Sequence, residues 1–410
     1  MIDPNILREE PDRVRTALKN RNMSTELVES FLSIDTEWRR MKTAQDELRA
    51  AQKKLGAGDR DEARRIKDAI SADEERVASL ETERAAILDL IPNIPANDVP
   101  VGPDESGNVV LRQVGEKPDL GASPKDYLAL ARGLIDTERA ARTSGSRFGY
   151  LFGEAVLLEF ALIEHALSLL VAKGFTPVVP PVMIKPEVYR GMGRLVGDQK
   201  EERYYLASDD LYLVGSSEHT VGPLHMGETL DEATLPRRYV AFSTCFRREA
   251  GSYGKDTKGI LRVHQFDKVE MFSFSDPEKS EEEHLFLLAR QEELIGSLGL
   301  PYQVVQICTG DMGTTDYKQY DIETWLPGQG RYRETNSCSN TTEYQARGIN
   351  ARFRRAATGK TELLHMLNAT GYAIGRVLIA IIENYQRADG SIAVPEVLQH
   401  YLGTDHIIPR

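Results

Sequence analysis

The chain has 410 residues, a formal net charge of −12 and an apolar fraction of 41%. Its length is enough for two or three domains with a large core. The acidic balance argues against a protein that binds nucleic acid over its whole surface, although a local basic patch remains compatible with it. The three cysteines, Cys245, Cys308 and Cys338, form no CxxC pair. We therefore expect no disulfide framework and no cysteine zinc site, and a reducing cytoplasm is the expected compartment.

No membrane segment is expected from the sequence. The N-terminal residues lack the apolar stretch of a signal peptide. The most apolar run covers residues 155–171, and Glu159, Glu164 and His165 interrupt it. We expect this run to be too polar and too short to span a membrane.

Residues 31–90 predict two helices that pack against each other. Seam positions recur at alternating spacings of three and four, first from Ile34 to Leu55 and then from Ala63 to Ile87. A glycine-containing turn, GAGDRDE, separates the two series, and no proline interrupts them. The pattern predicts an antiparallel helical hairpin roughly 35–40 Å long, because each helix of about 25 residues rises 1.5 Å per residue.

The expected tip of this hairpin is basic within an acidic protein. Between residues 49 and 67, seven cationic side chains outnumber three anionic ones, which leaves a balance of +4. A solvated helical surface would have this charge, and so would a tip that touches a phosphate backbone. The cationic residues are Arg49, Lys53, Lys54, Arg60, Arg64, Arg65 and Lys67.

A domain boundary is expected after the hairpin. Residues 91–103 contain four prolines and predict an extended linker, since proline cannot continue a helix. We expect an N-terminal domain over residues 1–110, with the hairpin at about 31–90, and a second domain over residues 111–410.

The second domain mixes strands and helices. A helix is expected from residue 150 to 173, ended by Gly174, and a proline-containing edge strand follows it. This helix and strand could form a dimer surface or ordinary core. A strand–turn–strand is expected at 204–214, with its turn at 208–210. Further strands are expected at 302–308, 316–325, 331–338 and 363–367, and helices at 280–298 and 372–386. With little βαβ alternation, the order predicts an α+β domain on a mainly antiparallel sheet. The chain contains no P-loop and no GxGxxG fingerprint.

Residues 246–270 predict a charged β-hairpin around a glycine-rich loop. Side chains two or four apart share one face of a strand. An exposed hairpin with weak surface ion pairs would have this sequence, and so would a platform that holds a polyanion beside an ammonium group. The residues expected to share faces are Arg247 and Glu249 on the first strand, and Arg262, Phe266 and Glu270 on the second.

These strings resemble the three motifs of class II aminoacyl-tRNA synthetases. FRRE, the glycine-rich loop and the Arg262, Phe266, Glu270 series are similar to motif 2. Gly174-Phe175 with Pro180-Pro181 is similar to motif 1, and residues 371–376 are similar to motif 3. Within the class, the resemblance is to the seryl-tRNA synthetases of bacterial type, and it covers nearly the whole chain. The strings that carry it are REAGSYGKDTKGILRVHQFDKVEMF, LGLPYQVVQICTGDMG, SCSN, YQAR and ENYQRADGSIAVPEVL.

The resemblance implies a fold and a reaction. A tRNA-binding helical coiled-coil arm would precede a class II catalytic domain, an antiparallel β-sheet with flanking helices. Serine and ATP would form seryl-adenylate and pyrophosphate, and serine would then pass to the 3′ end of tRNA(Ser), and also of tRNA(Sec). The resemblance also implies Mg²⁺ as cofactor, a homodimer, no membrane partner and a cytoplasmic location.

The resemblance also implies roles for individual residues. Glu218 would take the serine ammonium, Glu270 would read the amino and hydroxyl groups, and Thr370 would contact the hydroxyl. Arg247, Glu270 and Arg376 are the expected catalytic residues, and Glu334 and Ser337 are the expected Mg²⁺ ligands. The full serine set is Ser216, Ser217, Glu218, Arg247, Glu270, Asn368 and Thr370. The full ATP set is Arg247, Arg248, Glu249, Glu334, Thr335, Asn336, Ser337 and Arg376.

Some positions depart from the family pattern. Ser216 replaces a threonine, Arg248 stands where serine is common, Asn336 replaces a serine and Gly348 replaces an arginine. Two alternatives stay open: a paralogue with another acceptor or altered inhibitor sensitivity, and a non-catalytic tRNA-binding paralogue. A paralogue with another acceptor would be expected to lack the arm. A non-catalytic one would be expected to lose Arg247, Glu270 or Arg376.

Overall fold

The computed structural model describes residues 1–56, 59–250, 256 and 258–409. These residues form two compact units, Met1–Ile94 and Pro95–Arg410. The division lies upstream of the expected boundary at residue 110, because Ala96 and Val99 already belong to a cluster of the second unit. Their partners there are Val305, Ile307 and Met312.

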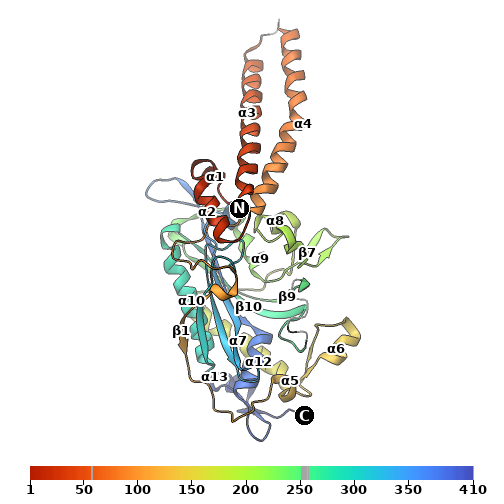
Figure 1. Cartoon of the computed structure of the whole chain (residues 1–410), viewed down its shortest axis with the longest axis vertical. Helices are drawn as coiled ribbons and strands as arrows, with labels where there is room; N and C mark the ends of the chain where they lie inside the picture. The colour runs from red at the N-terminus through yellow and green to blue at the C-terminus, as the bar shows by residue number, and fades with distance from the viewer. Residues whose placement is uncertain (57–58, 251–255, 257, 410) are drawn as a thin grey trace. The chain divides into compact units, whose positions relative to one another are not determined.

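The first unit is helical. Two short helices, α1 (Pro4–Glu9) and α2 (Pro11–Asn20), precede the long helices α3 (Glu26–Lys54) and α4 (Arg60–Leu90). α3 and α4 run side by side as a hairpin, which confirms the expected coiled-coil arm (Figure 1). Residues 57 and 58 of the expected turn lie outside the described residues. The buried seam includes Phe31, Ile66, Ile70, Val77 and Leu80.

A buried carboxylate connects three of these helices. Asp35 of α3 accepts hydrogen bonds from Nε and Nη2 of Arg8 at 2.7 and 2.8 Å, and from Nε of Arg84 in α4 at 2.6 Å. Burial opposes ionisation of Asp35, but its hydrogen bonds to Arg8 and Arg84 outweigh that effect and lower its pKa. The base of the hairpin is therefore fixed by one shared anion.

The second unit is built on an eight-stranded sheet, in the order β1-β11-β12-β13-β16-β10-β9-β4. Its pairs are antiparallel except for β4 with β9, which are parallel, and this confirms the expected α+β class. Proline-containing β4 lies at the edge, where a missing N–H costs least. The strands are β1 (Val109–Val114), β4 (Thr176–Val178), β9 (Arg237–Phe246), β10 (Gln265–Ser275), β11 (Tyr302–Gln306), β12 (Lys318–Leu326), β13 (Arg331–Asn340) and β16 (His365–Ala373).

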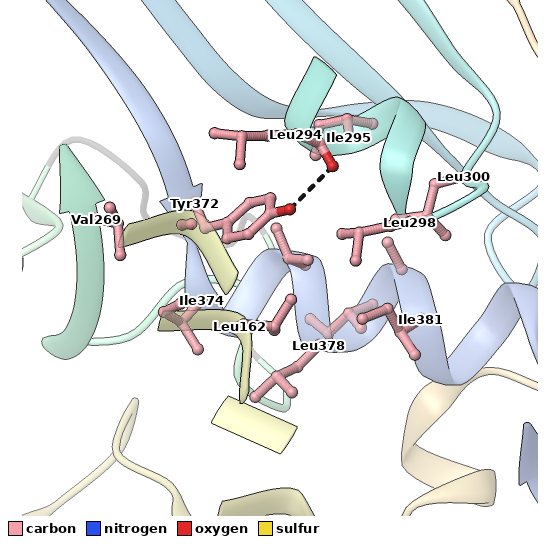
Figure 2. Packing of buried hydrophobic residues seen from close by; sticks show 14 of the residues in the cluster. Leu162, Val269, Leu294, Ile295, Leu298, Leu300, Tyr372, Ile374, Leu378 and Ile381 are labelled. Carbon is pink, nitrogen blue, oxygen red and sulfur yellow. Dashed lines mark hydrogen bonds between the residues drawn. The ribbon is translucent and has the colours of Figure 1, made fainter. Parts of the chain in front are cut away.

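The main core joins one face of this sheet to three helices, α7 (Glu154–Ala172), α10 (Ser280–Ser297) and α12 (Ile374–Asn384). Figure 2 shows Tyr372 at the centre of the cluster, between Val269, Leu294 and Leu162. Its hydroxyl donates a hydrogen bond to the carbonyl oxygen of Leu294 at 2.9 Å, so the buried phenol keeps a polar partner (Figure 2). Gly299, at φ +67°, ends the α10 segment as expected.

The helix α7 differs from expectation in one respect. By length and composition it could cross a membrane, and it is the one helix of the described residues that could. The core helix of a soluble protein passes the same test, and α7 packs on β16, β9 and β10. Leu158, Leu162 and Leu170 face that core, whereas Leu157 and Phe160 are 55% and 62% exposed. Its burial pattern is that of a helix covering a sheet.

The end of the chain also differs from expectation. A strand over 363–367 and a helix from Tyr372 were expected, but β16 extends to Ala373 and α12 begins at Ile374. The segment 368–371 is therefore part of a strand. It remains extended because β10 pairs with it from Lys268 to Ser275.

Short elements complete the second unit. The helices are α5 (Tyr127–Leu130), α6 (Thr137–Ser144), α8 (Pro186–Gly191), α9 (Glu218–Val221), α11 (Tyr344–Ile349) and α13 (Glu396–Leu402). The strands are β2 (Ile135–Asp136), β3 (Tyr150–Leu151), β5 (Met183–Ile184), β6 (Tyr205–Leu206), β7 (Leu211–Leu213), β8 (Thr229–Asp231), β14 (Arg352–Arg354), β15 (Thr361–Leu363), β17 (Ile392–Ala393) and β18 (His406–Ile407).

Candidate active site

A cavity of about 570 Å³ lies on the face of the sheet that the core helices leave free. The alternation of side chains along the strands explains this, because neighbours in sequence point to opposite faces. In β10, Lys268 and Glu270 line the cavity, while Val269 and Met271 belong to the core. In β16, Asn368 and Thr370 line the cavity in the same way, with Leu367 and Ala369 in the core.

The cavity brings together most of the residues singled out from the sequence. Ser217, Arg248 and Asn336 do not line it. Arg248 is exposed beside the ring of Tyr204, and Ser217 is buried at the start of α9. The expected residues that do line it are Ser216, Glu218, Arg247, Glu249, Glu270, Glu334, Thr335, Ser337, Asn368, Thr370 and Arg376.

The geometry of the charged hairpin corrects part of the expectation. β9 ends at Phe246, so Arg247 and Glu249 do not share a strand face, and Glu249 has φ +53°. Arg262 also lies outside the strand, because β10 begins at Gln265. The chain still brings the charges together, since Nη1 of Arg262 lies 3.2 Å from a carboxylate oxygen of Glu249. Residues 251–255 and 257 of the loop lie outside the described part of the chain.

Glu218 lines the cavity beside cationic side chains. Its carboxylate lies 2.6 Å from Nη2 of Arg194 and 3.3 Å from Nε2 of His219. Burial would raise the pKa of Glu218, but Arg194, His219 and Lys268 outweigh it and hold the pKa well below its usual value. Burial lowers the pKa of His219 to about 3, so this imidazole is neutral and its role is structural. Nδ1 of His219 lies 3.0 Å from the hydroxyl of Tyr189.

Glu270 has the opposite shift. Its carboxylate lies 2.5 Å from Nζ of Lys268, and that ammonium also donates to Oγ of Ser216 at 3.3 Å. Burial raises the pKa of Glu270 to about 7, and nearby Glu218 adds to the increase, while Lys268 and Arg247 oppose it. Two carboxyl groups in one cavity therefore differ in charge state near neutral pH.

Arg247, Arg376 and Glu334 also line the cavity. Nη1 of Arg376 donates to the carbonyl oxygen of Glu334 at 2.9 Å and lies 3.2 Å from its carboxylate. The guanidiniums of Arg376 and Arg247 hold the pKa of Glu334 below its usual value, so this half-exposed carboxylate is ionised. Nε of Arg247 donates to the carbonyl oxygen of Gly215 at 3.1 Å, which fixes the guanidinium above the ring of Phe266.

The oxygen atoms of Glu334 and Ser337 suit a hard cation that is also bound by substrate phosphates. Glu334 offers an anionic oxygen, and Oγ of Ser337 accepts a hydrogen bond from Nε2 of Gln319 at 3.1 Å. Within residues 1–56, 59–250, 256 and 258–409, no group of three or more His, Cys, Asp or Glu could hold a metal. Mg²⁺ commonly binds through one or two carboxylates plus substrate phosphates, so Glu334 and Ser337 fit that ion.

Comparison with known proteins decides the family. The model described as the tRNA synthetase class II core domain (G, H, P, S and T) matches residues 203–385, and that of the seryl-tRNA synthetase N-terminal domain matches residues 1–95. Serine–tRNA ligase of Acidothermus cellulolyticus is 44% identical to this chain, and 100% of both chains is covered. The enzyme of the same name from Streptomyces coelicolor is 45% identical, over 100% of this chain and 99% of its own length. The chain belongs to the seryl-tRNA synthetase family.

Solved structures agree with that family. Seryl-tRNA synthetase from Pyrococcus horikoshii, complexed with ATP, has a TM-score of 0.93 and 40% identity, with 100% of both chains covered. The cytoplasmic serine–tRNA ligase from Naegleria fowleri, in complex with AMP, has a TM-score of 0.90 and 33% identity, over 100% of this chain and 99% of that one.

Several residues that line the cavity of this seryl-tRNA synthetase family member were not predicted from the sequence. Arg194 and Arg203 come from the segment between α8 and β6, where no periodic pattern marks a side chain that turns inward. Lys268 could have been found, because it lies two residues before Glu270 and shares its strand face. Gln319, which supports Ser337, also lines the cavity.

One departure from the family pattern has a structural reason. A Cβ atom at Gly348 in α11 would lie 2.0 Å from the carbonyl oxygen of Gly191 in α8. The backbones of these two helices approach too closely for any side chain there. An arginine at position 348 would require the helices to separate.

Proposed function

We propose that this chain is a serine–tRNA ligase that activates serine with ATP and charges tRNA(Ser), and by family resemblance tRNA(Sec). The observation that carries the proposal is the single cavity with two kinds of charge. Glu218 and Glu270 line it together with Arg247, Arg376 and Glu334. An amino acid placed beside a triphosphate requires that arrangement.

The serine end would bind a small zwitterion with a hydroxyl. Glu218, held ionised by Arg194, would accept the ammonium group. Glu270 would contact the amino and hydroxyl groups, and the buried side chain of Thr370 would contact the hydroxyl. Ser216 and Asn368 complete the proposed subsite, and Ser217, which does not line the cavity, belongs to the serine set by resemblance. A buried site that pairs with a hydroxyl strongly rejects an analogue that lacks one.

The ATP end would hold three phosphates and the adenine ring. Arg247 would contact the α-phosphate and Arg376 the distal phosphates, because a guanidinium binds phosphate oxygens in a bidentate manner. Glu249 would contact the adenine edge, and Arg248, Thr335 and Asn336 belong to the proposed ATP set by resemblance. Glu334 and Ser337 would hold Mg²⁺, which neutralises phosphate charge when bound.

In the first step, a carboxylate oxygen of serine would attack the α-phosphorus of ATP, and pyrophosphate would leave. The serine carboxylate is already an anion, so no side chain has to remove a proton. The residues of the cavity would act by positioning and charge stabilisation, which are the main contributions to such transfers. In the second step, a terminal hydroxyl of tRNA would attack the seryl carbonyl carbon and release AMP.

The arm and the helix α7 suggest the macromolecular partners. The basic residues Arg49, Lys53, Lys54, Arg60, Arg64, Arg65 and Lys67 are exposed and would contact the phosphate backbone of tRNA. Exposed apolar residues on α7, including Leu157 and Phe160, would be covered in a homodimer. A cytoplasmic location without a membrane partner completes the proposal.

Serine-dependent exchange of labelled pyrophosphate into ATP tests the proposal. We expect exchange with serine, far weaker exchange with alanine or threonine, and charging of tRNA(Ser) by the same preparation. Exchange without charging of any tRNA would favour a paralogue with another acceptor. Absence of exchange together with retained tRNA binding would favour a non-catalytic paralogue, and either outcome would refute the proposal.

A further inference from the structure

The cavity contains a buried lysine for which the proposed reaction gives no role. Lys268 of β10 lines the cavity together with the two carboxylates that would read serine. Its residue exposure is 7%, so its ammonium has little access to water. A buried ammonium is costly unless anions and hydrogen-bond acceptors surround it.

The contacts of Lys268 lie within the proposed serine subsite. Nζ lies 2.5 Å from the carboxylate of Glu270 and donates to Oγ of Ser216 at 3.3 Å. Glu218, the other carboxylate, has its own cation, because Arg194 lies 2.6 Å from it. Each of the two carboxylates therefore has a cationic partner supplied by the protein itself.

We propose that Lys268 is a positioning residue that keeps Glu270 anionic and oriented, so that Glu270 can accept the ammonium group of serine. This inference rests on the proposed function of the cavity. Lys268 does not touch the reacting atoms, and it acts through Glu270. Serine binding then depends on the charge state of one buried carboxyl group.

The surroundings of Glu270 predict how that dependence varies with pH. Burial raises the pKa of Glu270 to about 7 even with Lys268 beside it. Glu270 is therefore mainly neutral below pH 7 and anionic above it. Removal of the Lys268 charge leaves burial and Glu218, which both raise the pKa of Glu270, opposed by the weaker effect of Arg247. Loss of Lys268 should move the ionisation of Glu270 to higher pH.

The other titratable groups around the cavity have pKa shifts of their own. Glu218 and Glu334 have pKa values below the usual range, and that of His219 is about 3. Burial raises the pKa of the thiol of Cys245, which lies on the Glu270 side of β9, and that of Cys338, which packs in the core on the other face of the sheet. Burial also raises the pKa of Asp321 in β12 well above its usual value. The ratio of KM between variant and wild type removes effects that both proteins share.

The experiment is serine-dependent pyrophosphate exchange from pH 6 to pH 9 with wild type, Lys268→Met and Lys268→Gln. If the ionisation of Glu270 moves up by one pH unit, the ratio of serine KM, variant to wild type, becomes about nine-fold at pH 6 and about five-fold at pH 7. At pH 9 it should return to about one, while the KM for ATP stays within about two-fold. Lys268→Arg retains the charge and should keep the ratio within about two-fold at every pH.

Lys318→Met is a matched control. Lys318 is a buried lysine that lies 2.6 Å from Asp98 and 2.7 Å from Glu281, and it does not line the cavity. Its loss should affect melting temperature without a pH-dependent serine KM. A ratio for Lys268→Met that is constant over pH, or equal to one throughout, overturns the inference. If Lys268→Met does not fold, the more polar Lys268→Gln decides. If wild type itself shows no serine-dependent exchange, the proposed function fails instead.

Discussion

Two glutamates in one cavity illustrate how environment determines charge at the scale of single residues. Glu218 and Glu270 are both buried, and burial alone would make both neutral. Arg194, His219 and Lys268 together lower the pKa of Glu218, whereas Glu270 keeps a pKa of about 7. The cavity thus offers one permanent anion and one carboxyl group whose charge depends on pH and on ligand.

Thr370 provides a test of hydroxyl recognition. Its side chain is buried in the cavity, in the strand next to Glu270. Thr370→Ala should lower the preference for serine over alanine by about 10- to 100-fold, the effect of losing one or two buried hydrogen bonds. Exchange assays with both amino acids measure the preference. Thr370→Ser keeps the hydroxyl and should retain it, so equal losses in both variants would contradict the assigned role.

Glu159 predicts a pH dependence of stability. This residue of α7 lines a second cavity of about 350 Å³ with Asp267, where burial and the hydrogen bond to Asp267 raise the pKa of Glu159 to about 8. In the unfolded chain the group ionises near its ordinary, lower pKa. Its stabilising contribution is therefore complete at low pH and is lost as pH rises toward 8. Glu159→Gln should unfold with a free energy about 1–2 kcal/mol higher than wild type at pH 8.5.

Denaturant unfolding at pH 5 and pH 8.5 measures this difference. The variant should gain stability relative to wild type only at the higher pH. Glu164→Gln, an exposed position on the same helix, provides the control and should show no such gain. An equal effect of Glu159→Gln at both pH values would contradict the prediction.

The residues of the candidate site were predictable where they belong to a family motif or to the alternating pattern of a strand. Arg247, Glu270 and Arg376 belong to recognisable motifs, and the structure places all three in one cavity. Arg194 and Arg203 were not predictable, because they come from an irregular segment and turn inward only through tertiary packing. The position of Asn336 was predicted as part of an ATP set, but its side chain points toward a neighbouring strand.

At the scale of elements, the cavity depends on a separation of β13 from β16. These strands pair only from Cys338 to Asn340. Beyond that point, Nδ2 of Asn336 donates to the carbonyl oxygens of Thr370 and Gly371 at 3.0 and 2.7 Å. Nε2 of Gln291 in α10 donates to those of Ser337 and Thr370 at 2.8 and 2.9 Å. Two amide side chains therefore replace backbone pairing where the sheet opens.

Asn336→Ala should weaken both the sheet and the serine subsite. It leaves two buried carbonyl groups with fewer donors, which should cost about 1–3 kcal/mol of unfolding free energy. Because Thr370 loses support, the KM for serine should rise more than the KM for ATP. Urea unfolding and exchange kinetics measure the two effects. Asn336→Ser introduces the residue that the resemblance implies at this position and should lie between wild type and alanine. An unchanged stability in both variants would refute the bridging role.

The elements themselves were predictable to different degrees. The helices α3 and α4 have long heptad patterns, so their existence and type followed from spacing. The extent of β16 could not be predicted from spacing, because the sequence from Asn368 to Gly371 is typical of a turn. This segment is a strand because β10 pairs with it. The strand predicted to contain Glu249 was also wrong in extent. Glu249 has φ +53°, a turn conformation that the alternation of charged residues does not reveal.

At the scale of the whole molecule, the two compact units predict separable activities. Removing residues 43–76, with a short glycine turn in their place, shortens the arm but keeps Asp35 with Arg8 and Arg84. Pyrophosphate exchange should stay within about two-fold of wild type, because the cavity belongs to the second unit. The kcat/KM for tRNA charging should fall about 100-fold or more through lost phosphate contacts. Full charging by the shortened protein would refute the role of the arm.

The position of β16 also has a consequence for synthesis of the chain. β16 lies between β13 and β10, so it joins the half-sheet β1-β11-β12-β13 to the half-sheet β10-β9-β4. A ribosome-bound chain that ends before His365 has about nine-tenths of its residues and two unconnected half-sheets. Because Asn368, Thr370 and Arg376 all lie beyond that point, such a fragment lacks part of the cavity and should not activate serine. The ability to bind substrates therefore depends on the late, long-range pairing of β16 with β13 and β10, near the end of translation.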